Sequence, residues 1–316
     1  EEVTANTLRD KDVTLFVRLG TDFVENYYEY ELPLYLTPWY TNNADAVWPE
    51  VNNMEIVFDD LLNLKKRRNN MLGQPNSGVA ANVEYVMVDP QNPERRIKVK
   101  GSPNLQGIKT IMIGVRNPVK NQPTPWNATD DGLAKCVQVW VNELRLTDFV
   151  DDGGSAAIAQ MQVQAADFGS FSLSGNYSGI NWGAVDSRVQ ERQRNQRVGM
   201  DFQTNLQLGQ FFGNRIKLSV PFFYGYSLGV INPEYDPFNP DIKLSSYEAG
   251  QRKGIARVAQ DYTERKSYNF QGVRKERAAG KKAHFYDVSN LTLGYGYSES
   301  LHRDFNTKYD RPKHWK

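Results

Sequence analysis

The chain has 316 residues, room for two domains, and a formal net charge of +1, which gives no global field for nucleic acid or acidic ligands. No apolar run approaches the roughly twenty residues of a membrane helix, so a helical membrane protein is excluded. The single Cys136 excludes an internal disulfide. Because the chain starts at Glu1 without Met or a signal-like apolar core, we expect a piece of a longer, exported polypeptide.

Residues 1–150 predict a soluble domain. Its short segments alternate apolar with polar residues, which is typical of strands. We expect these strands at 13–19, 28–32, 82–88, 95–100, 107–115 and 135–146, the last with a bulge near Asn142. Residues 53–68 follow a helical period, and their basic end fits a solvated helix C-terminus better than a nucleic-acid patch. Residues 117–132, rich in Pro, Asn and Asp, predict a loop. The pattern favours a β-sandwich of jelly-roll type with a helical insertion.

After a turn-forming stretch at 151–154, five longer segments alternate apolar with small polar residues, at 157–168, 170–178, 200–211, 215–230 and 290–298. The segment at 215–230 keeps its period of two for sixteen residues. Strands of soluble domains run about five or six residues, whereas a tilted membrane strand needs roughly nine to eleven. The repetition therefore predicts antiparallel transmembrane β-barrel strands. Five strands cannot close a barrel, so we expect a segment of a larger one.

The connections predict a topology. Turns at 168–169 and 212–214 look tight and those at 181–197 and 232–285 look long, as in outer-membrane barrels, which by analogy puts the first domain on the extracellular side. The Pro-rich start of 232–285 and a helical period at 248–266 predict an ordered insertion. The expected organisation is all-β with minor helical insertions: a sandwich domain at 1–150, four membrane strands at 151–231, the insertion at 232–285, and a further strand and loop at 286–316.

Alternation assigns each strand residue to one of two faces. The polar set is expected to line a pore: Gln160, Gln162, Gln164, Ser172, Ser174, Asn176, Gln203, Asn205, Gln207, Ser219, Ser227, Thr292 and Gly296. The apolar set is expected to face lipid: Phe171, Leu173, Leu206, Leu208, Ile216, Leu218, Val220, Phe222, Tyr224, Tyr226, Leu291, Leu293 and Tyr295. The alternative interpretation is that these residues form the polar face that any barrel has, without a role in transport.

Motifs for chemistry are missing from the sequence. His284, His302 and His314 are spaced too widely for a local metal motif, and no Cys pair accompanies them. Asp130-Asp131 and Asp151-Asp152 fit turn chemistry better than a calcium loop. No Gly-rich phosphate loop or nucleophile elbow occurs. We therefore expect no enzyme activity, no catalytic residue, no cofactor and no metal site.

Two stretches resemble one known family. Val-Trp-Val-Asn-Glu-Leu-Arg-Leu at 139–146 and Asn-Pro-Glu-Tyr-Asp-Pro at 232–237, followed by Asn-Pro-Asp-Ile, are similar to the SprA (Sov) family of giant outer-membrane barrels of the Bacteroidetes type IX secretion system. Leu-Gln-Leu-Gly at 206–209 and Asp-Tyr-Thr-Glu-Arg at 261–265 keep the same order, so the resemblance covers about the last two thirds of the chain.

The resemblance implies a translocon in the outer membrane that passes folded cargo with C-terminal signal domains to the cell surface and serves gliding motility. It further implies a PorV-like partner barrel, a periplasmic plug protein, the rest of the parent chain and the lipid bilayer as partners, and no nucleic acid. A neutral polar wall would not retain cargo by ion pairing.

Two alternatives remain open from the residues alone. One is a nutrient-uptake barrel whose sandwich binds glycan. The other is a wholly soluble β-rich adhesin, in which the residues assigned to lipid would be buried against a second sheet.

Overall fold

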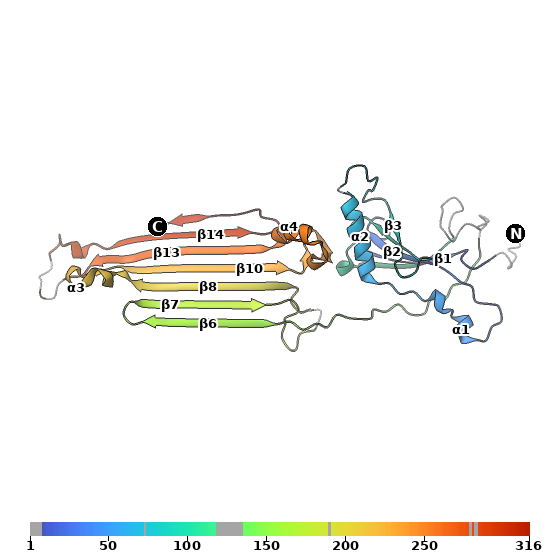
Figure 1. The fold of residues 1–316 in the computed structure, drawn as a ribbon, viewed down its shortest axis with the longest axis horizontal. Coiled ribbons are helices and arrows are strands. Elements are labelled where there is room, and N and C mark those ends of the chain that lie inside the picture. The colour runs from blue at the N-terminus through green and yellow to red at the C-terminus, as the bar shows by residue number, and fades with distance from the viewer. Residues whose placement is uncertain (1–7, 73, 118–134, 189–190, 278–279, 281–283) are drawn as a thin grey trace. The chain divides into compact units, whose positions relative to one another are not determined.

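The computed structural model describes residues 8–72, 74–117, 135–188, 191–277, 280 and 284–316, so the loop predicted at 117–132 lies almost wholly outside the described residues. The chain divides into two compact units, which are described separately (Figure 1). The first comprises residues 1–147 with 239–241, and the second comprises 148–238 with 242–316. Among the described residues, no helix is both long and apolar enough to cross a membrane.

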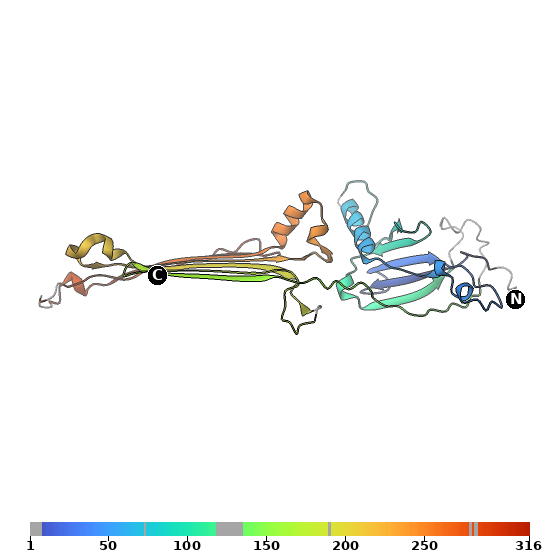
Figure 2. The same ribbon diagram turned by 60° about the horizontal axis from the view of Figure 1, so that its bottom comes forward.

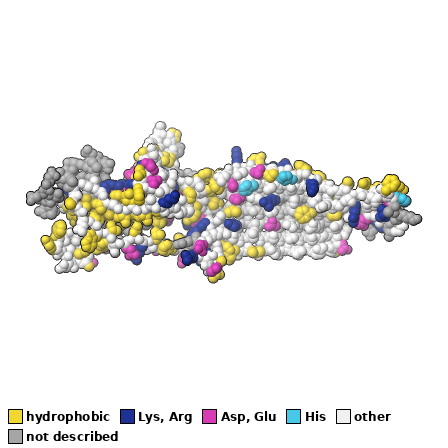
Figure 3. Space-filling model, turned by 180° about the vertical axis from the view of Figure 1, so that it is seen from behind, with side chains coloured by type: hydrophobic (Ala, Val, Ile, Leu, Met, Phe, Trp, Pro, Cys, Tyr) yellow, Lys and Arg dark blue, Asp and Glu magenta, His cyan; other side chains and the backbone are white. Residues whose placement is uncertain are grey.

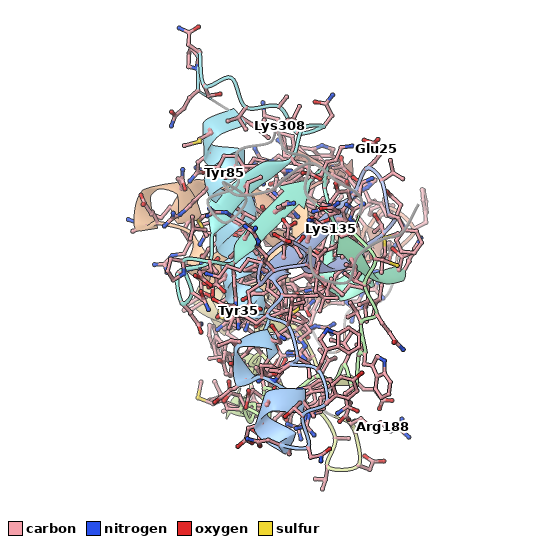
Figure 4. The ribbon with its side chains drawn as sticks, turned by 90° about the vertical axis from the view of Figure 1, so that its right-hand side faces the viewer. Glu25, Tyr35, Tyr85, Lys135, Arg188 and Lys308 are labelled. Carbon is pink, nitrogen blue, oxygen red and sulfur yellow. The ribbon has the colours of Figure 1, made fainter. Side chains whose placement is uncertain are left out.

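The first unit contains one antiparallel sheet in the order β3-β4-β2-β1-β5. Its strands are β1 (Thr14–Gly20), β2 (Tyr27–Pro33), β3 (Tyr85–Val88), β4 (Arg96–Lys100) and β5 (Thr110–Arg116). Helix α2 (Phe58–Leu72) covers one face, where Leu61 and Leu64 pack against Tyr28, Tyr30 and Ile97. Figure 4 shows α2 beside the strands, near the labelled Tyr85. The short elements are α1 (Ala44–Val47), η2 (Glu50–Asn52) and η3 (Leu105–Gly107).

The all-β class with minor helices is confirmed, but the sandwich is not the arrangement found in the described part of the first unit. A helix, not a second sheet, covers the strands. The strand predicted at 135–146 runs without regular secondary structure. Val137 and Val139 point to the same side of the extended chain and pack beside Val13 and Leu32, while Trp140 is 78% exposed. The alternation of apolar and polar residues correctly predicted an extended chain here. An extended chain can bury alternate side chains without pairing to another strand.

Two charged residues of α2 are buried, Lys65 and Arg68. The Lys65 ammonium donates to the carboxylate of Asp241 at 2.7 Å and to the carbonyl of Pro103 at 2.9 Å. The Tyr28 hydroxyl donates to the same carboxylate at 2.7 Å, and burial together with the Asp241 charge raises the pKa of Tyr28. These bonds satisfy groups that would be costly to bury unpaired.

The second unit is organised by an eight-stranded antiparallel sheet. Its main order is β15-β14-β13-β10-β8-β7-β6, and β9 pairs with β13. The strands are β6 (Ala156–Ala165), β7 (Gly169–Ser178), β8 (Asn195–Gln207), β9 (Leu218–Ser219), β10 (Pro221–Pro233), β13 (Asp261–Lys275), β14 (Leu293–Arg303) and β15 (Lys313–Trp315). The remaining elements are η5 (Leu208–Phe212), α3 (Gly213–Ile216), β11 (Tyr235–Asp236), β12 (Asn239–Lys243), η6 (Leu244–Ser246), α4 (Ala249–Ala259) and η7 (Val288–Asn290).

The strand predicted at 215–230 is interrupted at its start. Helix α3 occupies 213–216, Lys217 takes a left-handed conformation with φ of 51°, and the ladder of β10 begins only at Pro221. The loop predicted to be tight at 212–214 is therefore part of a longer connection. Left-handed backbone at a residue other than glycine depends on its surroundings, and alternation alone does not reveal it.

The helix predicted at 248–266 ends at Ala259, and β13 follows from Asp261. A long strand therefore lies inside the stretch read as a loop insertion. It splits that stretch into one connection at 234–260 and another at 276–292, so the predicted alternation of tight and long connections is also wrong.

Candidate functional site: the two faces of the eight-stranded sheet

The register of the sheet brings small neutral polar side chains together on one face. Directly opposed residues of neighbouring strands share a face. One row crosses the sheet as Gln162, Ser172, Gln203, Gly225, Ser267, Ser298 and His314. The next runs Gln164, Ser170, Asn205, Phe223, Asn269 and Gly296. In Figure 3 the part of the surface that carries the sheet is mostly white, the colour of backbone and uncharged polar side chains, with scattered charged and hydrophobic side chains.

The opposite face is apolar and aromatic. One row runs Val163, Phe171, Thr204, Tyr224, Tyr268, Tyr297 and Trp315. The rings of Tyr268 and Tyr297 stack at 4.9 Å, and those of Tyr297 and Trp315 meet edge-on at 4.3 Å. The next row includes Phe222 and Phe270, whose ring centroids are 4.8 Å apart. Cross-strand aromatic contacts of this kind stabilise the pairing of strands.

Neither face is covered by a second layer of described residues. Figure 2 shows the sheet edge-on as a single layer, with α3 near one end and α4 near the other. Ala156 to Gln164 are exposed whichever way they point. In the long strands only Gly169, Thr204 and Tyr297 are buried. Soluble monomers rarely expose a contiguous apolar surface larger than a few hundred Å², so we expect lipid or further protein to cover the apolar face.

Charged residues are confined to particular strands. β6, β7 and β10 contain none over 10, 10 and 13 residues. On the apolar face, Lys266 and Glu264 form an ion pair at 2.7 Å toward the α4 end of β13. On the polar face, Asp201 and Arg265 lie one row beyond the neutral rows, toward the same end. Ser227, the middle residue of β10, opposes both Asp201 and Arg265, so charged residues reach the middle of the sheet, and of the long strands described only β6, β7 and β10 are uncharged along their whole length.

Most residues assigned to the two faces from the sequence lie on opposite faces. The polar face holds Gln160, Gln162, Gln164, Ser172, Ser174, Asn176, Gln203, Asn205, Gln207, Ser227 and Gly296. The other face holds Phe171, Leu173, Leu206, Phe222, Tyr224, Tyr226, Leu293 and Tyr295. Whether one face meets water and the other lipid stays a prediction.

Several assigned residues fall outside the main ladder. Ser219 and Leu218 belong to β9, where they oppose Arg274 and Lys275. Those outside any strand are Leu208 in η5, Ile216 in α3, and Val220, Leu291 and Thr292 in connecting segments.

Sequence reasoning missed the contribution of β13 to both faces. This strand adds Ser267 and Asn269 to the polar rows and Tyr268 and Phe270 to the aromatic ones. A signal was present, since Tyr262, Tyr268 and Phe270 share one parity. It was obscured by Glu264 and Lys266 at the same parity, which made the stretch look polar.

A second cluster of charges, in the first unit, is structural. The carboxylate of Glu29 is fully buried and accepts hydrogen bonds from Arg18, Lys98 and Arg116, between 2.6 and 3.2 Å. Burial raises the pKa of Glu29, but the hydrogen bond from Arg116 and the charge of Lys98 outweigh it and hold the pKa at about 2. A carboxylate so fully bonded has no capacity left to act as a base.

The described part of the second unit is a one-layer antiparallel sheet with one apolar and one largely neutral polar face, whereas the first unit has a compact core. The chain belongs to the SprA_N family, described as motility related/secretion protein, whose model matches residues 1–247. No curated protein matches the chain. The match confirms the resemblance at the level of the family and supports a secretion- and motility-related, non-enzymatic role.

Proposed function

We propose that the chain supplies part of the wall of a protein-conducting channel in the outer membrane, of the type IX secretion kind. The observation that carries this proposal is the pair of unlike, uncovered faces on one sheet. The apolar face would contact hydrocarbon, and the neutral face would line a water-filled passage. The uncharged lengths of β6, β7 and β10 match the roughly nine to eleven residues of a membrane-crossing strand.

The neutral wall also suits large cargo. Ser, Gln and Asn side chains present hydrogen-bonding groups that water satisfies equally well, and Gly presents none, so a passing polypeptide gains little by adhering. A passage for folded proteins needs more strands than this sheet contains. Among the described residues, β6 pairs along one edge only, with β7, and in hydrocarbon its free backbone groups must be paired. The rest of the parent polypeptide is the proposed source of those strands, and a PorV-like barrel and a periplasmic plug are proposed partners.

Cysteine labelling of neighbouring residues on β7 tests the wall. In full-length protein with Cys136→Ser, the variants Ser172→Cys and Leu173→Cys differ by one position and lie on opposite faces. We expect the first to react only with a membrane-impermeant thiol reagent and the second only with a lipid-phase reagent. Resistance of both cysteines to both reagents in native protein would place the strand in a dry core, and the soluble adhesin would then be the better account.

Protein conduction needs a separate test. A photo-crosslinking residue at Gln203, on the polar face, should form adducts with secreted cargo in actively exporting cells. The same residue at Phe202, on the other face, should not. If cysteine labelling supports the two faces but no cargo is crosslinked, the chain would be part of a membrane barrel and the proposal of protein conduction would be wrong.

A further inference from the structure

A loop of the first unit presents three aromatic rings to solvent. Its residues, 37–51, are called the aromatic loop. Trp39 is 81% exposed, Tyr40 is 99% exposed and Trp48 is 49% exposed. Large rings displayed singly are common on surfaces. Here three lie on one short segment, and the adjacent rings of Trp39 and Tyr40, with centroids 6.5 Å apart, are both turned to solvent, which needs an explanation.

The aromatic loop is held in shape at its base. The Asn52 side chain donates to the carbonyl of Tyr35 at 2.7 Å and accepts from its amide at 2.9 Å, which closes the chain just outside the loop. Within it, the Thr37 hydroxyl donates to the carbonyl of Val47 at 3.1 Å. Asn43 caps α1 by accepting from the amide of Asp45. Figure 4 shows these turns in blue below the labelled Tyr35. The rings are therefore displayed by an ordered segment.

Tyr40 is held in an unfavourable conformation. Its φ of 60° is left-handed, which costs an aromatic residue free energy that glycine would not lose. Nothing in the fold is gained in return, because the side chain is almost fully exposed. Backbone strain at an exposed residue is more readily explained by a ligand than by stability.

The polar groups between the rings indicate what kind of ligand fits. Asn42, Asn43 and Asp45 lie in sequence between Tyr40 and Trp48, and the described structure gives no hydrogen bond to the Asn42 amide group or to the Asp45 carboxylate. Insertion of the rings into hydrocarbon would carry these polar groups along and desolvate them. A polyhydroxylated ligand would instead hydrogen-bond to them.

The charges of the aromatic loop and its surroundings further limit the chemical class of the ligand. Residues 19–64 contain no Lys, Arg or His, and the aromatic loop itself carries Asp45 and Glu50. Arg95, a cation from outside this range, is bonded to the carbonyls of Val51 and Asn53. An anionic lipid surface or a sulfated glycan would meet carboxylates without compensating cations. The ligand should therefore be neutral.

We propose that the aromatic loop is a binding site for a neutral oligosaccharide. The C–H-rich faces of sugar rings would stack on Trp39, Tyr40 and Trp48, whose ring faces carry the negative part of the aromatic quadrupole. The amide groups of Asn42 and Asn43 and the carboxylate of Asp45 would bond the sugar hydroxyls. The site goes beyond the channel wall and does not depend on it.

The test is titration of the full chain with neutral hexasaccharides of glucose, xylose, mannose and N-acetylglucosamine, followed by tryptophan fluorescence and calorimetry. Zwitterionic phosphatidylcholine vesicles serve as the membrane comparison. The informative variant is Tyr40→Gly, which removes the ring while keeping a residue that accepts the left-handed backbone. Trp39→Ala removes the neighbouring ring. Trp140→Ala, at an exposed tryptophan outside the loop, is the matched control.

We expect at least one hexasaccharide to bind, and both loop variants to weaken its affinity by roughly tenfold or more, equivalent to 1.4 kcal/mol of binding per tenfold. Trp140→Ala should bind as the unmodified chain does, and the thermal midpoint of Tyr40→Gly should not fall. Absence of binding to every hexasaccharide overturns the proposal. So does sugar binding that survives both loop variants, or vesicle binding lost in the same variants without sugar binding, which would identify a membrane-contacting loop.

Discussion

Arg18 and Glu29 oppose each other directly on β1 and β2, and the guanidinium Nε and Nη2 both donate to Oε2 of the carboxylate, at 3.0 and 2.6 Å. The guanidinium carbon also lies 3.7 Å from the ring centroid of Tyr27. Lys98 and Arg116 complete the ring of cations around the same carboxylate. The buried Glu29 on β2 thus holds side chains from three other strands, β1, β4 and β5, on the sheet face opposite α2.

Glu29→Gln should destabilise the first unit by about 3 kcal/mol at neutral pH, because it leaves three cations around a neutral group. The folded-state pKa of Glu29 is about 2 against an ordinary 4.5, so its stabilisation is complete above pH 4.5 and is lost as pH falls toward 2. The variant should therefore differ most from the unmodified chain at neutral pH and least near pH 2.

Hydrogen exchange of β1 and β2 in the full chain measures this loss at neutral pH, and acid titration by circular dichroism measures its pH dependence. Glu25→Gln is the control. Its pair with Lys100, at 3.3 Å, is exposed, so the change should stay below about 0.5 kcal/mol. Equal effects of the two substitutions would show that burial of Glu29 does not matter.

Lysine substitutions on β7 should separate its two faces. Leu173→Lys places a charge on the apolar face and should cost about 2–4 kcal/mol if that face lies near the bilayer midplane. Ser172→Lys, one residue away on the polar face, should cost less than about 1 kcal/mol. The yield of folded full-length protein in the membrane fraction measures both. Comparable losses would indicate that both faces see the same medium.

Gly272 should be sensitive to substitution for backbone reasons alone. It is the extra residue of a bulge in β13, between the pairs Gln271–Gly294 and Val273–Leu293, with φ of 80°. A Cβ there would meet no atom within 4 Å. Gly272→Ala should therefore cost about 1–2 kcal/mol from the left-handed backbone. Gly294→Ala, in ordinary conformation, should cost less, and hydrogen exchange of β13 and β14 compares the two.

Tyr297 and Trp315 should be energetically coupled. Their rings meet edge-on across β14 and β15, and Tyr297 is the buried member. A double-mutant cycle with Tyr297→Ala and Trp315→Ala should give a coupling of about 0.5–1.5 kcal/mol. Thermal unfolding of the full-length protein in detergent provides the four values. Strict additivity would show that the contact adds nothing beyond the area each ring buries.

Alternation predicted the strands whose two faces differ consistently. β6, β7 and β10 have mostly polar or small residues on one parity and mostly apolar ones on the other, and their partners lie on the expected faces. β13 failed the same test because Glu264 and Lys266 occupy the apolar parity and Gly272 then shifts the count by one. A bulge and an ion pair are local events, and period counting assumes that neither occurs.

The first unit was harder to predict because its pairing is non-local. β2 lies between β1 and β4, and β5 pairs with β1 across about ninety residues of chain, for which short alternating segments give no order. The segment at 135–146 has good strand composition and no ladder, which shows that an alternating pattern does not by itself provide a pairing partner. The aromatic loop was not singled out because exposure of Trp39 and Tyr40 cannot be read from composition.

Among the described residues, one edge of β6 has no strand paired to it, and this affects how the protein avoids aggregation while it folds. Natural edges are guarded by lysine, proline or a bulge, and the ten residues of β6 include neither lysine nor proline and pair with β7 without a bulge. β15, at the other side of the sheet, is three residues long and carries Lys313. Until another strand pairs with this edge, any extended chain could pair with β6, including β6 of a second copy. If the sheet is part of a larger barrel, as proposed, we expect the edge of β6 to be shielded until a further strand pairs with it.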